Sequence, residues 1–134
     1  FGLEAGRKFP TASTRVGGSN EADYTVNGIY STEINKVTFD VNANITRLGL
    51  DEPNLARHQF GWAFGVSRPL TGPWGGALEL AGTRREGAES TQQLLAAVSY
   101  TVSSAVVIDF GHAWGLNNAS PDTAVFAGVT LLFK

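Results

Sequence analysis

The 134-residue sequence contains no cysteine and no methionine. Without cysteine, disulfide bridges, thiolate catalysis and cysteine-based metal sites are excluded. Because no initiator methionine is present, we expect a processed mature protein or a piece of a longer chain. No segment has the basic and apolar regions of a signal peptide. The length fits a single domain, residues 1–134.

Charged residues are scarce, and long apolar runs are absent. Charged residues make up 16% of the sequence, against about 25% in typical soluble domains. The net charge of −2 gives no electrostatic reason to expect a nucleic-acid partner. No stretch approaches the roughly 18 consecutive apolar residues of a membrane-spanning helix. If this chain crosses a membrane, it must do so as a closed barrel, because backbone polar groups in lipid have no water to bond.

The strongest positive signal is an alternation of apolar and polar residues with period two, clearest in segment 37–46. Its apolar residues are Val37, Phe39, Val41, Ala43 and Ile45. Its polar residues are Thr38, Asp40, Asn42, Asn44 and Thr46. One face is thus apolar and the other polar, which a strand produces and a helix cannot. The length also suits a tilted membrane strand, which needs about 9–11 residues.

About eight such segments follow one another along the chain. They cover residues 1–9, 23–34, 37–46, 57–70, 74–86, 91–102, 105–116 and 122–134. Short turns (35–36, 71–73 and 103–104) alternate with longer connections (10–22, 51–56, 86–90 and 117–121). Outer-membrane barrels alternate short periplasmic turns with longer outer loops in this way. The sequence therefore predicts an all-β, antiparallel up-and-down transmembrane β-barrel with both termini on the periplasmic side.

The aromatic residues agree with this orientation, because membrane barrels carry aromatic girdles at both interfaces. The predicted periplasmic rim carries Phe1, Tyr30, Phe39, Trp74, Tyr100 and Phe133. The predicted outer rim carries Phe9, Tyr24, Phe60 and Trp114. The alternative is a soluble barrel or sandwich whose apolar faces pack inward. Against it, the polar face includes the small residues Gly61, Ala63, Gly65 and Ser67, which suit a crowded lumen better than a solvated surface.

Three stretches of the sequence resemble a known family. They are residues 9–13 (FPTAS), 93–100 (QLLAAVSY) and 115–133 (GLNNASPDTAVFAGVTLLF). They are similar to the outer-membrane transporter-like proteins labelled "meta-pathway of phenol degradation", and the likeness covers most of the chain. The resemblance implies an outer-membrane barrel that passes hydrophobic or aromatic compounds, with no catalytic motif to carry over. Family members are typically longer, which implies that this chain is the C-terminal part of a larger barrel or a shortened one.

Several polar residues face the predicted lumen by their phase in the strands. They are Glu4, Asp40, Asn42, Asn44, Glu79, Arg85 and Asp109. In a barrel larger than eight strands we expect them to line a water-filled path that prefers cations. In an eight-stranded barrel the interior is about wide enough for side chains alone, and we expect these groups to pair into a plug. Paired carboxylates also serve glycosidic chemistry, but a ring of them inside a barrel is weak evidence for it.

Arg7, Arg47 and Arg84 fall near the outer ends of their strands on the apolar face. They are candidates for binding lipopolysaccharide phosphates, for which the guanidinium fork is well suited. The alternative is ordinary snorkelling into the interface. His58 and His112 also face outward near the outer rim, and their positions indicate neither a catalytic nor a metal site.

The predicted function is a passive outer-membrane channel or transporter for small, hydrophobic or aromatic compounds. The alternative is a closed, non-conducting barrel with a structural or interaction role, because the fold alone does not decide between them. The expected partners are the lipid bilayer, lipopolysaccharide and a small-molecule substrate. We expect no cofactor, no metal and no catalytic residue.

Overall fold

The computed structural model describes residues 1–9, 21–50 and 52–133, and this part of the chain consists of strands, turns and loops without a helix. Its eight strands are β1 (Gly2–Lys8), β2 (Asp23–Ile34), β3 (Val37–Arg47), β4 (His58–Pro69), β5 (Trp74–Arg85), β6 (Thr91–Ser103), β7 (Val106–Gly115) and β8 (Thr123–Leu131). No helix in the described residues is long and apolar enough to cross a membrane. The predicted connection 10–22 and the terminal Lys134 lie largely outside the described residues.

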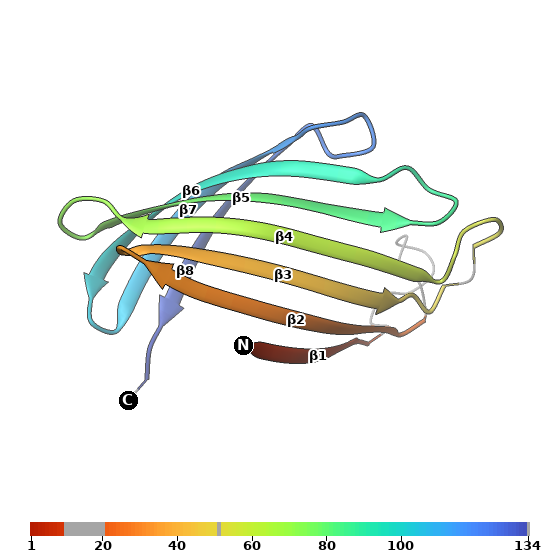
Figure 1. Cartoon of the computed structure of the whole chain (residues 1–134), viewed down its shortest axis with the longest axis horizontal. Helices are drawn as coiled ribbons and strands as arrows, with labels where there is room; N and C mark the ends of the chain where they lie inside the picture. Colours follow the sequence, from red (N-terminus) through yellow and green to blue (C-terminus); the bar gives the residue numbers. More distant parts are fainter. Residues whose placement is uncertain (10–20, 51, 134) are drawn as a thin grey trace.

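The strands form one sheet in the order β1-β2-β3-β4-β5-β6-β7-β8, and each strand pairs antiparallel with the next. This confirms the predicted all-β, antiparallel up-and-down architecture. The sheet curls into a half-barrel, as Figure 1 shows. Among the described residues, β1 pairs only with β2 and β8 pairs only with β7, so the curl is not closed.

The two ends of the sheet differ in their connections. At one end, here called the turn end, β2 passes to β3 through Asn35 and Lys36, whose φ angles are 53° and 65°. Two consecutive positive φ values define the type I′ turn, which matches the twist of paired strands. The turn between β6 and β7 lies at Ser104–Ala105, one residue later than predicted, because the register shifts between Thr101 and Ser103. A β-bulge there adds a residue to β6. The opposite end, with the longer connections, is called the loop end.

The register keeps the apolar and polar faces in phase across the sheet. Val41 pairs with Tyr30 on one side and Phe64 on the other, whereas its neighbour Asp40 pairs with Ser31 and Gly65. Along β2 the polar-face positions are the less exposed ones and the apolar-face positions the more exposed ones, up to Tyr30. The polar face therefore lies on the inside of the curl, and the apolar face is convex.

The distribution of apolar side chains is the reverse of a soluble core. Among the described residues, Ala113 is the one buried hydrophobic side chain. By contrast, Val26 is 49% exposed, Leu78 56% and Phe110 55%, all on the convex face. Isolated exposed apolar residues are ordinary, but a contiguous apolar face of this kind marks a surface that contacts something other than water.

Candidate functional site

The concave face is the candidate site, because it gathers the polar groups of all eight strands. The register places all seven residues of the predicted lumen lining on this face: Glu4, Asp40, Asn42, Asn44, Glu79, Arg85 and Asp109. They occur on the alternate strands β1, β3, β5 and β7. The structure does not bring them into one cluster but spreads them along the height of the sheet.

Two of the inner carboxylates are held by neighbours on the adjacent strand. Asn27 Nδ2 donates to Glu4 Oε2 at 3.0 Å, and the Ser31 hydroxyl donates to Asp40 Oδ1 at 2.5 Å. Hydrogen bonds to a charged acceptor are worth about 1.5–3 kcal/mol when desolvated, and less on this open surface. These pairs fix the orientation of both carboxylates along the wall of the sheet.

Glu79 and Asp109, the other two carboxylates of the predicted lining, make no hydrogen bond or ion pair within the described part of the chain. Glu79 stands between Gly65 and Leu95, which offer no polar side chain. Asp109 stands between Ser99 and Gly128. Both groups are therefore available to an ion or a ligand on the concave face.

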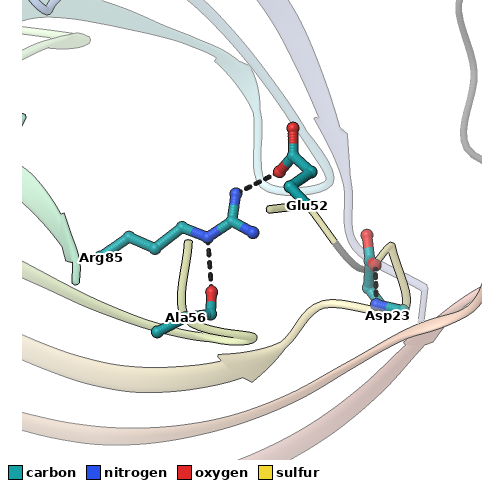
Figure 2. A network of polar contacts seen from close by, with 5 residues as sticks. Asp23, Glu52, Ala56 and Arg85 are labelled. Carbon is teal, nitrogen blue, oxygen red and sulfur yellow. Dashed lines mark hydrogen bonds and ion pairs between the residues drawn. The ribbon is translucent and has the colours of Figure 1, made fainter. Parts of the chain in front are cut away.

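Arg85 connects the wall of the sheet to the loop between β3 and β4 (Figure 2). Its Nη1 lies 2.5 Å from Glu52 Oε2, and its Nε donates to the carbonyl of Ala56 at 2.6 Å. The Arg85 side chain is only 12% exposed, and its Nη2 is buried without a hydrogen-bond partner. The guanidinium thus draws the loop over the loop end of the concave face.

Further contacts stabilise the described residues at the loop end. Gly49 N donates to Asp23 Oδ1 at 3.0 Å, as Figure 2 also shows, and Lys8 pairs with Asp23 at 3.4 Å. Ser120, only 7% exposed, accepts from Gln92 N and donates to Gln92 O. No sequence pattern pointed to Glu52 or Ser120, because both lie in connections without periodicity.

The three arginines predicted to bind phosphate lie on the convex face at the loop end. Arg7 stacks over the rings of Phe9 and Tyr24, with its guanidinium carbon 4.7 and 5.4 Å from the ring centroids. Tyr24 also pairs with Arg47 in the register, and both arginines line one hollow of about 400 Å³. Arg84 pairs with Phe60 two strands further along and lines a different hollow. The structure brings Arg7 and Arg47 together and leaves Arg84 apart.

His112, one of the two outward histidines, contacts two neighbouring side chains. The ring of His112 stacks on Trp114 at 4.3 Å, and its Nε2 shares a hydrogen bond with the Thr123 hydroxyl. A hydroxyl activated as a nucleophile needs a base that a third group orients, and no described residue bonds the other ring nitrogen of His112. Groups of three or more potential metal ligands are likewise absent from the described ranges.

Comparisons with known proteins assign no family. No protein-family model matches the sequence, and no curated protein matches it. The resemblance to the phenol-degradation transporter-like barrels therefore stays a prediction.

Proposed function

We propose that this protein is a bacterial outer-membrane β-barrel in which the convex face contacts lipid and the concave face lines a passive path for small molecules. The proposal keeps the predicted location, with the lipid bilayer and lipopolysaccharide as partners. The substrates suggested by the family resemblance are small hydrophobic or aromatic compounds.

One observation carries this proposal: the large apolar side chains lie outside the curl and the polar side chains lie inside. At about 25 cal/mol per Å², side chains such as Phe64, Leu78 and Phe110, roughly half-exposed here, gain stability only if something apolar covers the convex face. Hydrocarbon can cover the whole face at once, whereas water leaves it unfavourably exposed. The aromatic pair Trp74–Tyr100, with ring centroids 4.9 Å apart at the turn end, suits an interfacial girdle.

The open edges set a condition on this proposal. A sheet edge in hydrocarbon leaves backbone donors and acceptors unpaired at a cost of several kcal/mol each. The membrane form therefore needs both β1 and β8 paired. Because β1 and β8 run in opposite directions, an even number of additional strands closes the ring with every neighbour antiparallel.

Ion conduction through planar bilayers tests the path. With Asp40 and Glu79 on the concave face, the open protein should prefer cations, because fixed negative charge raises the local cation concentration. Asp40→Asn and Glu79→Gln should each weaken that preference without abolishing conduction. A correctly folded protein that shows no conductance contradicts the path.

The second candidate is a closed, non-conducting barrel with a structural or interaction role. The observation in its favour is the Arg85 contact with Glu52 and Ala56, which holds a loop across the loop end. If the loop only narrows a path, Arg85→Met should raise the single-channel conductance. If neither the native protein nor Arg85→Met conducts, the non-conducting barrel is the better account.

A further inference from the structure

The concave face contains a hollow of about 500 Å³ at the turn end, which the proposed path does not by itself explain. Ser67, Ala77, Ala97 and Phe126 line it and belong to one row of the register across β4 to β8, in which Gly111 stands between Ala97 and Phe126. The small side chains of Ser67, Ala77 and Ala97 leave the space, and Phe126 closes one side. A volume of this size falls in the range of small-molecule sites.

The next row toward the turn end supplies the polar groups. There Gly75, Ser99, Asp109 and Gly128 are consecutive partners across β5 to β8. The Ser99 hydroxyl leans over Gly75, where a Cβ would lie 2.5 Å from it. The Asp109 carboxylate leans the opposite way over Gly128, where a Cβ would lie 2.6 Å from Oδ2. The two side chains diverge, so the floor between them stays open.

Phe126 and Asp109 are positioned against each other on the β7–β8 pair. The Phe126 ring lies over Gly111, where an added Cβ would come within 2.1 Å of the ring. Glycines at 111 and 128 are thus what allow the ring and the carboxylate to lie flat against the wall. Since Asp109 and Gly111 are two residues apart on one strand, the backbone positions at which the carboxylate and the ring lie are separated by about 6.7 Å along the strand.

The charged group on the concave side of the hollow is the Asp109 carboxylate. Asp109 has no ion-pair or hydrogen-bond partner among the described residues. Arg68 also lines the hollow, but its register places it opposite Gly76 on the convex face, and its Nε donates to the Pro69 carbonyl at 3.3 Å. A ligand on the concave side of the hollow therefore meets an unpaired carboxylate, hydroxyl groups and an aromatic ring.

We infer that this hollow is a binding site for small arylalkylamines, whose ammonium group bonds Asp109 while the aromatic body packs on Phe126, Ala77 and Ala97. The offset between carboxylate and ring corresponds to an amine separated from its ring by a short alkyl chain. A site on the wall of a path must bind weakly enough to release its ligand, which suits this half-open geometry. The inference rests on the proposed function for its role in transport, but not for its binding chemistry.

Chemical-shift titration of the whole chain, folded in zwitterionic micelles, tests the site. The probes are 2-phenylethylamine, 2-phenylethanol and phenylacetate, which share one body and differ in charge. The amine should shift the amide signals of residues 97–99, 109–111 and 126–128. Its dissociation constant should be about tenfold lower than that of the alcohol, because the ammonium group adds an ion pair with the carboxylate that the neutral hydroxyl cannot make. Phenylacetate should bind most weakly.

Variants assign the charge preference to Asp109. Asp109→Asn should bring the amine and the alcohol to similar affinity, whereas the control Asp122→Asn removes the same charge at the loop end and should keep the preference. Phe126→Leu should weaken both probes alike. Equal binding of all three probes to the native protein overturns the site even if no variant folds, and so does a preference that survives in Asp109→Asn.

The outcome is separable from that of the conduction experiment. If the protein binds the amine at these residues but conducts no ions, the binding site is supported and the path is contradicted. If it conducts ions but shows no preference for the amine, the path is supported and the binding site is contradicted.

Discussion

Gly82 lies on the convex face of β5, where there is no room for a side chain. A Cβ at this position would lie 2.7 Å from the Thr91 carbonyl oxygen and 3.0 Å from the Trp62 ring. The backbone oxygen cannot yield without moving β6, so the packing of Trp62 onto the sheet depends on this glycine.

We therefore expect Gly82→Ala to lower the free energy of unfolding by about 1–3 kcal/mol, the usual cost of overpacking. Urea-induced unfolding of the folded protein in lipid vesicles measures it. Gly6→Ala on β1 is the matched control, because nothing lies within 4 Å of its added Cβ, and it should change stability by less than about 0.5 kcal/mol. Equal losses in both variants would mean that the convex packing at Trp62 is not as described.

The convex arginines give a second prediction for single residues. Arg7 is fixed by two aromatic rings, and Arg47 shares its hollow, so a phosphate at the loop end meets two guanidinium groups. Replacing Arg7, Arg47 and Arg84 together by Gln should weaken retention of lipopolysaccharide on the purified protein without unfolding it.

The matched control for this experiment is Arg68→Gln, since Arg68 lies on the same face at the turn end. It should leave lipopolysaccharide retention unchanged. If the triple variant retains as much lipopolysaccharide as the native protein, the arginines act only by snorkelling into the interface.

At the scale of a strand, β3 tests which face contacts lipid. Val41 and Asn42 are adjacent near the middle of β3, and the register sends them to opposite faces. Val41→Arg should block insertion into vesicles, because Arg on a lipid face costs about 2–4 kcal/mol at the bilayer midplane. Asn42→Arg, which adds the same charge to the concave face, should insert far better. Equal insertion of the two variants, measured by heat-modifiable gel mobility, would show that the facing assignment is wrong.

Strand phase could be predicted from sequence at this scale, and strand ends less well. The alternation in 37–46 fixed the facing of β3, because a shift of one residue would reverse every side chain. The β6–β7 turn lies one residue later than predicted, because the apolar pattern of the strand does not reveal the bulge between Thr101 and Ser103. Phe126 broke the alternation, and only the cross-strand glycine at 111 accounts for its position.

At the scale of the whole molecule, the open curl predicts how closure occurs. The chain has no cysteine, so disulfide formation between two introduced cysteines can be measured without interference from native thiols. In the monomer, Ala5→Cys with Ala127→Cys, on the outward faces of β1 and β8, should form no disulfide within the chain, because these strands are not paired.

The control pair is Ile108→Cys with Val129→Cys, which are register partners on β7 and β8 and should oxidise readily. An edge pair that closes within one chain as completely as the control would mean that the eight strands form a barrel alone. A product at twice the chain's mass would identify a second copy as the source of the closing strands.

The sequence alone determined the strands, their number, their antiparallel order and the face to which most side chains point. It could do so because period-two patterning and turn residues are local signals, read from neighbours in the chain. It also selected the inner carboxylates, since phase follows from position within a strand.

Only the tertiary structure decided which of these groups act together. The pairing of Ser31 with Asp40, the reach of Arg85 to Glu52 and the hollow between Asp109 and Phe126 depend on register and curvature. The open edges at β1 and β8 were also beyond the sequence pattern, because closure depends on how far eight strands curl and not on how each of them alternates.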